Sequence, residues 1–384
     1  MAESSFKNGW RSYRFDQMAS MINDRIDNPQ EAGVDRYVGL EHLDPESLTI
    51  RRWGAPSDVT ATKLLFRRGD IIFGRRRVYQ GKLAVADFDG ICSAHAMVLR
   101  AKRDVVLPEF LPFFMQSDTF MERAKAISVG SLSPTINWKS LAKEEFALPP
   151  LDEQRHISAQ LLAIVRSEDS FERLSNALAV ARESFALSLW SDLGRTLPLL
   201  DVCIKIQDGT HFSPKSSTGP YRYVTSKNIQ LDELDLSDTG WISKEEHDEI
   251  YRRCDVAQGD VLLTKDGANA GNVAVNTERE PFSLLSSVAF IRPDPGSLVT
   301  AYLFEYLRSR AGRSRLLSLV KGSAITRLTL DQLRAFEVPV PSLDVQRSCC
   351  SRFIEIKEAM DSVRQRSSQL AVARALVQEI LGQR

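Results

Sequence analysis

The sequence lacks any long apolar run, since no stretch of about 18 consecutive apolar residues occurs in its 384 residues. A membrane-spanning helix is therefore not expected. The first ten residues, MAESSFKNGW, also lack the apolar core of a secretion signal. The five cysteines have no C-x-x-C spacing, and their odd number is typical of reduced thiols. These absences favour a cytoplasmic protein.

Catalytic signatures are absent too. No G-x-x-x-x-G-K-[ST] loop occurs, so a P-loop motor is unsupported. The single Pro-Pro pair, Pro149-Pro150, has leucines on both sides, where an adenine methyltransferase corner needs polar residues. Five scattered histidines include no H-x-x-x-H pair, so a zinc site is not expected. We predict a chain with no catalytic residue, no metal site and no cofactor of its own.

An internal repeat organises the sequence. The segment Leu151–Arg155 (LDEQR) returns as Leu343–Arg347 (LDVQR), 192 positions later. The segment Leu178–Arg182 (LAVAR) returns unchanged as Leu370–Arg374 at the same offset. Further upstream the offset becomes 190, where the run GDII at residue 69 matches GDVL at residue 259. The chain is a tandem duplication.

Each copy predicts a mixed domain followed by a long helix. Residues 1–148 and 194–340 combine short β-rich runs with Asp-Gly turns. They include expected strands at 70–73 and 260–263 and expected helices at 107–126 and 298–320. Residues 149–193 and 341–384 contain stretches of nearly forty residues without Pro or Gly, which predict long helices beginning near Asp152 and Asp344. The predicted fold class is α+β, with two duplicated mixed α/β domains separated by two long helices.

An apolar residue recurs every seventh position in both helices, as in a coiled-coil seam. The predicted seam consists of Ile157, Ile164, Phe171, Leu178, Phe185, Ile356, Val363, Leu370 and Val377. Matched length and phase favour an antiparallel coiled coil. The alternative is that each helix packs separately on its own domain.

Fifty Lys and Arg balance fifty Asp and Glu, which excludes a uniformly basic chain. Local clusters remain: residues 47–103 hold twelve basic against four acidic residues, and residues 308–334 hold seven against one. Basic residues neutralise phosphates, arginine reads guanine edges, and Gly, Ser, Thr and Asn suit loops close to DNA. The candidate DNA contacts are Lys63, Arg75, Arg76, Arg77, Ser131, Ser133, Lys265, Asn269, Lys321, Ser323, Thr326 and Arg327. The alternative for each cluster is a solvent-exposed basic surface that binds no ligand.

The order domain, helix, domain, helix resembles the specificity (S) subunit of type I restriction-modification systems. The first long helix opens with LPPLDEQR at residues 148–155, and residues 37–43 and 259–267 resemble parts of a target-recognition domain. The likeness covers nearly the whole chain. The second copy departs from it, because VPVPSL precedes Asp344 and Val345 replaces the glutamate.

This resemblance implies a non-catalytic reader of double-stranded DNA. Each mixed domain would be a target-recognition domain for one half of a bipartite, asymmetric target. The helix pair would measure the spacer and dock two methyltransferase subunits. Those subunits would hold S-adenosylmethionine and flip the target adenine. A translocase-nuclease subunit is a further expected partner, and no membrane is expected.

Two other functions stay open from the sequence. The chain fits a specificity module of another DNA-modification or defence assembly. It also fits a protein scaffold in which the basic clusters are incidental.

We predict that the purified chain alone neither methylates nor cleaves DNA, because motifs for both reactions are missing. Methyl transfer from labelled S-adenosylmethionine and nicking of a plasmid are the measurements. The same assays with an added methyltransferase preparation are the positive control. Activity of a contaminant-free chain would contradict the prediction.

Overall fold

The computed structural model describes residues 9–191, 195–319 and 327–382. It divides into two compact units, one of residues 1–171 with 365–384 and one of residues 172–364. Each unit contains one mixed domain, here called the first module (residues 9–150) and the second module (residues 195–342). Each unit also takes part of both long helices, so the compact units cut across the division expected from sequence.

The two modules share one sheet topology. In the first, four strands lie in the order β2 (Ala19–Ile22), β9 (Ala96–Ala101), β6 (Ile71–Gly74) and β7 (Leu83–Val85). In the second, the order is β12 (Cys203–Asp208), β18 (Val288–Pro293), β15 (Val261–Thr264) and β16 (Val273–Val275). A two-stranded ribbon closes each module, β1 (Arg11–Arg14) with β10 (Glu145–Leu148), and β11 (Thr196–Pro198) with β19 (Glu337–Pro339). The duplication read from the sequence therefore holds at the level of the fold.

The modules differ in a second, more peripheral sheet. The first module orders it β3 (Arg25–Ile26), β5 (Lys63–Phe66), β8 (Gly90–Ser93) and β4 (Tyr37–Val38), with 3₁₀ turns η1 (Pro29–Glu31), η2 (Leu40–His42) and η3 (Pro56–Asp58) nearby. The second orders it β14 (Gly240–Ile242), β13 (Tyr221–Val224) and β17 (Ser283–Leu284), with η5 (Ser226–Asn228) and α7 (Lys244–Tyr251). Sequence similarity between the copies is weakest in these regions, in agreement with this difference.

The helices expected at 107–126 and 298–320 are each broken in two. The first gives α2 (Leu111–Gln116) and α3 (Asp118–Ala126), and the second gives α8 (Thr300–Arg308) and α9 (Arg310–Ser318). Ser117 and Ser309 cause the breaks, because each has extended backbone and accepts the amide N–H three residues later in its side-chain oxygen. Both segments are helical as expected, but the sequence pattern did not reveal the serine cap that divides each of them. Short helices α1 (Phe15–Met18), α4 (Trp138–Leu141), α6 (Leu199–Val202) and α10 (Leu330–Arg334) complete the modules.

The repeated Gly-Asp before β6 and β15 builds the same turn in both modules. Gly69 and Gly259 both have φ of 90°, which disfavours residues with a side chain. Asp70 accepts the Arg67 amide and forms two bonds with Arg100, of 2.7 and 2.9 Å. Asp260 does the same in the second module with the amide of Ala257 and the side chain of Arg292, both bonds to Arg292 being 2.8 Å long. The two strands expected after these turns are confirmed, shifted by one residue.

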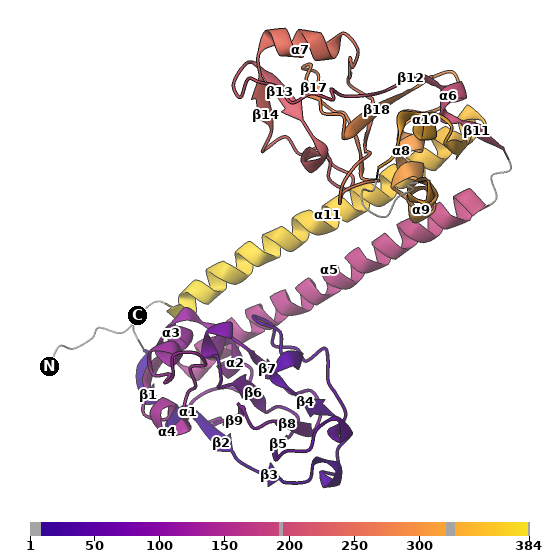
Figure 1. Cartoon of the computed structure of the whole chain (residues 1–384). Helices are drawn as coiled ribbons and strands as arrows, with labels where there is room; N and C mark the ends of the chain where they lie inside the picture. The colour runs from indigo at the N-terminus through magenta and orange to yellow at the C-terminus, as the bar shows by residue number, and fades with distance from the viewer. Residues whose placement is uncertain (1–8, 192–194, 320–326, 383–384) are drawn as a thin grey trace. The chain divides into compact units, whose positions relative to one another are not determined.

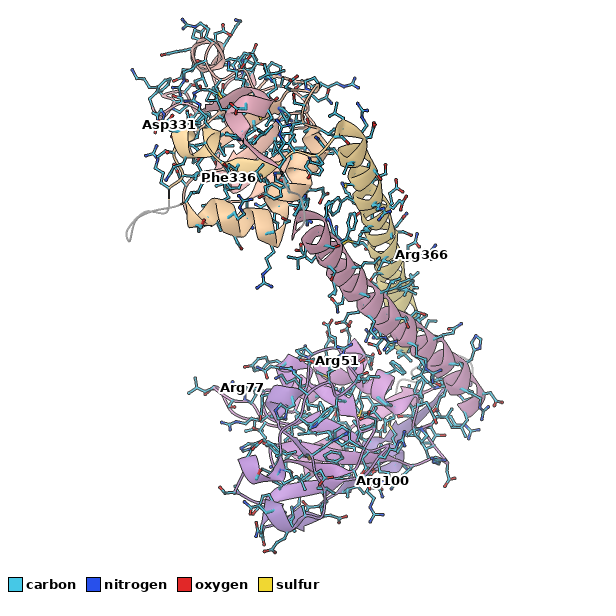
Figure 2. All side chains as sticks on the ribbon, turned by 90° about the vertical axis from the view of Figure 1, so that its right-hand side faces the viewer. Arg51, Arg77, Arg100, Asp331, Phe336 and Arg366 are labelled. Carbon is cyan, nitrogen blue, oxygen red and sulfur yellow. The ribbon has the colours of Figure 1, made fainter. Side chains whose placement is uncertain are left out.

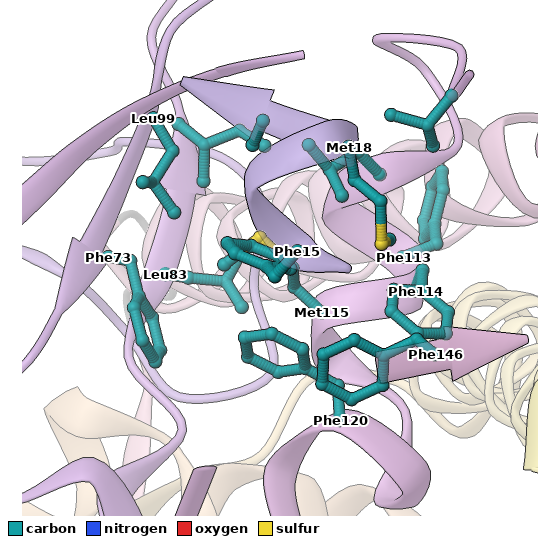
Figure 3. Packing of buried hydrophobic residues seen from close by; sticks show 14 of the residues in the cluster. Phe15, Met18, Phe73, Leu83, Leu99, Phe113, Phe114, Met115, Phe120 and Phe146 are labelled. Atoms are coloured by element: carbon teal, nitrogen blue, oxygen red, sulfur yellow. The ribbon is translucent and has the colours of Figure 1, made fainter. Parts of the chain in front are cut away.

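An aromatic cluster fills the first module (Figure 3). Phe15 lies 5.5 Å from Phe120 and 6.0 Å from Phe146 between ring centres, and Phe114 lies 5.4 Å from Phe146. Edge-to-face and tilted contacts of this kind add stability beyond the burial of area. The cluster packs on the start of the first long helix, where Ile157 and Leu161 are buried.

The long helices are α5 (Leu151–Ser191), of 41 residues, and α11 (Leu343–Gly382), of 40 residues. Both begin one residue before the aspartate expected as the start. At 1.5 Å per residue each is about 60 Å long. Among the described residues, no helix is long and apolar enough to cross a membrane.

The helices pack on each other inside each unit, as Figure 1 lets the reader follow. In the first unit, Ile157 and Leu161 of α5 share a core with Val377 and Leu381 of α11. In the second unit, Phe185 of α5 lies 4.9 Å from Phe353 of α11, and Trp190 stacks on the same ring at 5.7 Å. The start of α5 thus lies by the end of α11, and the reverse, which makes the pair antiparallel.

The residues of the predicted seam are buried or half-buried. Ile157 and Val363 are 3 % and 7 % exposed, and the other members, Ile164, Phe171, Leu178, Phe185, Ile356, Leu370 and Val377, lie between buried and exposed. The separate packing of each helix on its own module is excluded by the contacts of α5 with α11.

A buried glutamine joins each long helix to the module before it. Gln154 accepts the Leu107 N–H at 2.9 Å and donates to the carbonyls of Val105 and Pro149 at 3.1 and 2.9 Å. Gln346 repeats the arrangement with Val299, Ser297 and Pro341, at 2.8, 3.0 and 2.9 Å. The glutamine of the repeated LDxQR motif therefore has a structural role, because its buried side chain satisfies three backbone groups at the junction of helix and module.

We predict that Gln154→Leu lowers the free energy of unfolding by about 2 to 4 kcal/mol, because it leaves three backbone groups at a largely buried junction without partners. Urea unfolding of the full chain is the measurement. Arg155→Ala, on the exposed face one position away, should change it by no more than about 0.5 kcal/mol. Equal effects of the two substitutions would contradict the assignment.

Candidate nucleic-acid interface

Two segments of the first module that are distant in sequence form one loop pair. The backbone N–H of Arg77 donates to Pro134 at 2.7 Å, and the Ile136 N–H donates to the Arg75 carbonyl at 2.9 Å. Arg76 Nε donates to Ser133 Oγ at 2.8 Å. We call residues 75–77 with 129–136 the first loop pair. Of the predicted contacts, it holds Arg75, Arg76, Arg77, Ser131 and Ser133.

A cluster of cations surrounds His95 beside this loop pair. The Arg75 N–H donates to the His95 carbonyl at 3.2 Å. Burial lowers the pKa of His95, and the charges of Arg76, Arg75 and Lys63 lower it further. The imidazole is therefore held neutral at physiological pH. Lys63 itself is only 7 % exposed and donates to the Ala61 carbonyl at 2.6 Å, so it contributes charge more than a surface contact.

The first loop pair carries positive charge that no described carboxylate neutralises. Within residues 9–191, 195–319 and 327–382, no carboxylate forms an ion pair with Arg75, Arg76 or Arg77. Arg76 and Arg77 are exposed, and Figure 2 shows Arg77 extending away from the ribbon. A phosphate backbone is the natural counter-charge for such a group.

The rest of the basic run at 47–103 is largely occupied in the fold. Arg100 pairs with Asp70, Arg51 with Asp169 and Arg52 with Asp44. Lys82 and Lys102 donate to backbone carbonyls at 2.7 Å. The excess counted in the sequence therefore overstates the charge available to a ligand, and the first loop pair carries the clearest uncompensated part.

The second module has a corresponding pairing, here called the second loop pair, between residues 265–269 and residues 327–328. The Leu328 N–H donates to the Lys265 carbonyl at 3.0 Å, and Asp266 forms a backbone bridge with Arg327. The pairing matches that of Ile136 with Arg75 and of Thr135 with Arg76 in the first module. The modules thus present the same backbone frame.

The expectation that Lys265 contacts DNA is corrected by its position. Its side chain is 2 % exposed, and its Nζ lies 3.0 Å from Asp208 Oδ2. Asp208 also accepts a bond from Arg253 and lies 3.5 Å from His211 Nε2. A cation buried against a carboxylate and excluded from water is part of the core, so Lys265 supports the loop from beneath.

Charges on the second loop pair are largely compensated. Arg327 is half-exposed, and its Nε lies 3.6 Å from Asp266, which occupies the place of Arg76. Asn269 is partly exposed, and its carbonyl accepts the Asn272 N–H at 3.0 Å. Three other predicted contacts, Lys321, Ser323 and Thr326, lie outside the described residues.

Most described cations of the second basic run, 308–334, also have partners inside the chain. Arg308 pairs with Asp232, Arg315 Nη1 donates to the Tyr306 hydroxyl at 2.7 Å, and Arg334 pairs with Asp331 at 3.2 Å. Arg313 lies against the 265–271 turn, with Nη2 3.5 Å from the Ala270 carbonyl. As a patch that neutralises phosphate, this run is weaker than its sequence suggests.

Sequence reasoning missed two residues that shape these loops. His95 lies on the turn between β8 and β9, and a lone histidine gives no pattern by which to find it. Asp208 ends β12 in an Asp-Gly turn and holds Lys265, Arg253 and His211 from beneath. Its turn was read from the sequence, but its buried charge was not.

Cysteine chemistry does not contribute to either loop pair. All five cysteines are unpaired. Burial raises the pKa of the Cys92, Cys203 and Cys254 thiols to about 12, which keeps them protonated and poorly nucleophilic at neutral pH. Among the described residues, no group of three or more His, Cys, Asp or Glu side chains is placed to hold a metal ion.

A pocket of about 470 Å³ lies elsewhere in the first unit, between η4 (Val78–Gln80), α3 and the long helices. Arg374 lines it, donating to Glu168 at 3.2 Å and to the Glu46 carbonyl at 2.9 Å. Its image in the other copy, Arg182, is buried and bonds both oxygens of Glu305, at 2.6 and 2.7 Å. In each unit the repeated arginine of LAVAR thus bonds a long helix to the neighbouring module. It is not part of a loop pair.

The two modules thus share one backbone frame and carry unlike loop pairs. Comparison with known sequences gives the family: the type I restriction modification DNA specificity domain matches residues 58–178 and 196–370. These matches cover most of the chain, which therefore belongs to this family.

Curated relatives agree with this membership. The specificity subunit of the type I restriction enzyme EcoDI from Escherichia coli is 33% identical over 183 residues. That of EcoBI, also from Escherichia coli, is 31% identical over 155 residues. The matches span 46% and 40% of this chain, and 39% and 32% of the respective relatives, so both are partial.

Solved structures extend the similarity of fold to the whole chain. The S subunit of a type I restriction-modification system from M. genitalium has a TM-score of 0.64 at 15% identity, covering 98% of this chain and 97% of its own. The HsdS subunit from Thermoanaerobacter tengcongensis has a TM-score of 0.51 at 22% identity, covering 100% and 98%. At such identities the comparison establishes the fold.

We predict that Asp208→Asn lowers the free energy of unfolding by at least about 3 kcal/mol, because it leaves buried Lys265 without its counter-charge. Asp331→Asn removes a carboxylate that is 93% exposed and should change it by less than about 0.5 kcal/mol. Chemical unfolding of both variants is the measurement. A small effect of Asp208→Asn would contradict the assignment of Lys265 as a buried cation that depends on Asp208.

Proposed function

We propose that this chain is the non-catalytic specificity subunit of a type I DNA modification complex and reads a bipartite, asymmetric target in double-stranded DNA. One observation carries the proposal: the two modules hold their loop pairs on the same backbone frame but with different side chains and charge. Two copies of a reader with unlike contacts suit two unlike half-sites, as paired modules elsewhere suit paired half-sites.

The first module would bind its half-site with a larger electrostatic component. Its loop pair holds three arginines without ion-pair partners, whereas Asp266 and Asp208 compensate Arg327 and Lys265 in the second. Each phosphate contact adds to the salt dependence of binding. The second module would depend more on polar loop residues, among them Asn269.

The partners would be two methyltransferase subunits, docked along the paired helices, with a translocase-nuclease subunit as a further member. We propose that S-adenosylmethionine binds to the methyltransferase subunits and that this chain holds no cofactor. A complex that acts on chromosomal DNA would work in the cytoplasm. Membership of the DNA specificity family supports these assignments.

The length of the helix pair would set the spacer between half-sites. Support comes from α5 and α11, which run for 41 and 40 residues without interruption and pack on each other through apolar side chains. Adding one heptad to both helices preserves the seam, because the apolar residues recur every seven positions. It would add about 10 Å, or roughly three base pairs at 3.4 Å each.

Methylome sequencing tests the proposal in a host with the gene, without it, and with a heptad inserted after both Ala177 and Asp361. We expect one bipartite methylated motif that disappears on deletion. The heptad variant should keep both half-sites and lengthen the spacer by about three base pairs.

Three other results would contradict parts of the proposal. A methylome that deletion does not change would exclude the specificity role. Changed half-sites with the old spacer would exclude the helices as the measure of distance. A host protein bound in place of DNA by the purified complex would favour the scaffold.

A further inference from the structure

One residue of the first loop pair has a backbone conformation that suits glycine. Arg77 has φ of 55° and ψ of 51°, the left-handed region that side chains disfavour. Residues with β-carbons adopt it rarely, and Asn and Asp are more common there than Arg. Such outliers concentrate at functional sites, where the surrounding structure holds them in place.

The second copy supplies an internal comparison at this position. Residues 69–85 align with 259–275 without a gap, at the offset of 190. Both segments have left-handed backbone at three matched places, which are Gly69 with Gly259, Arg77 with Gly267 and Gly81 with Gly271. Only one of these six positions departs from glycine, and it is Arg77.

The turns themselves are equivalent. The Gln80 N–H donates to the Arg77 carbonyl at 2.9 Å, and the Ala270 N–H donates to the Gly267 carbonyl at 3.1 Å. A β-carbon added at Gly267 would meet no atom within 4 Å, so crowding at that atom does not explain the glycine there. The fold requires a left-handed residue at this point, and glycine meets that requirement in the other copy.

Among the residues that the structure describes, no contact accounts for arginine at position 77. Its side chain is exposed and makes no capping bond to η4. In the part of the chain that the structure describes, no carboxylate pairs with it. Arg76 and Arg75 already supply positive charge one and two residues away, so charge alone does not require a third arginine in a disfavoured conformation.

Resting on the proposed function, we infer that Arg77 is a specificity-determining residue that reads a guanine in the half-site of the first module. A phosphate contact tolerates many positions, but two parallel bonds to guanine O6 and N7 require a fixed guanidinium. The left-handed turn fixes the direction in which the Arg77 side chain leaves the backbone, because the Arg77 N–H donates to the Pro134 carbonyl and the Arg77 carbonyl accepts the Gln80 N–H.

Arg77→Gly tests the inference, with the full chain assembled with its methyltransferase subunits and the duplex defined by the methylome. Fluorescence anisotropy should show about a tenfold to hundredfold loss of affinity for the target. Discrimination against base changes should disappear at one guanine of one half-site and persist in the other. Thermal unfolding of the variant chain should shift upward by roughly two to four degrees, because the backbone strain is removed.

Three further variants make the result specific. Arg77→Lys keeps the charge and should keep salt-dependent binding while losing discrimination at the same guanine. Arg103→Ala removes one charge from another exposed site of the module and should leave discrimination unchanged. Glu46→Gly removes the same kind of strain at another exposed residue, with φ of 61°, and should raise stability without relaxing discrimination.

The contrary results are distinct. If the wild-type complex does not discriminate its target from a scrambled duplex, the proposed function fails and the inference fails with it. If the wild type discriminates and Arg77→Gly or Arg77→Lys does so equally well, the function stands and the role of Arg77 is excluded. Lower stability of Arg77→Gly would remove the strain argument on which the inference depends.

Discussion

The buried glutamine at the start of each long helix is the interaction on which the rest of the arrangement depends. The buried side chains of Gln154 and Gln346 each bond three backbone groups at a largely buried junction, and in doing so they fix where a helix leaves its module. A hydrophobic contact at this junction would permit the helix to slide or rotate. Directional bonds do not, since a misplaced amide would leave buried donors and acceptors unpaired. The repeated glutamine therefore fixes the orientation of each long helix at its module as well as its attachment.

The order of domains and long helices could be predicted because the sequence repeats itself and its apolar residues recur at a fixed period. An offset of 192 revealed the duplication, and a seven-residue period identified the apolar side of both helices. Both features are sums over many residues, so single exceptions do not obscure them. The breaks at Ser117 and Ser309 were missed for the opposite reason. One serine decides each break, and its effect depends on whether its oxygen caps the next helix or points to solvent.

The candidate site was predictable only in part, because the sequence counts charges but does not pair them. Arg75, Arg76 and Arg77 remained unneutralised, as their clustering suggested. Lys265 looked equally available in the sequence and is in fact enclosed with Asp208, a residue 57 positions away. Ion pairs across such separations depend on strand order, which a linear pattern does not contain. The strand order therefore decides which cations of a basic run are left for a ligand.

Duplication gives this chain a comparison that a single domain lacks. The two modules share the Gly-Asp turn, the central sheet, the serine break and the glutamine joint, so these features belong to the frame. Where two matched positions share a backbone conformation but differ in side chain, the other copy shows that folding does not require that side chain. The difference then has to be explained by something outside the fold. Arg76 with Asp266 and Arg77 with Gly267 are two such differences, and both lie in the loop pairs. The modules therefore diverge on the surface that these loops present.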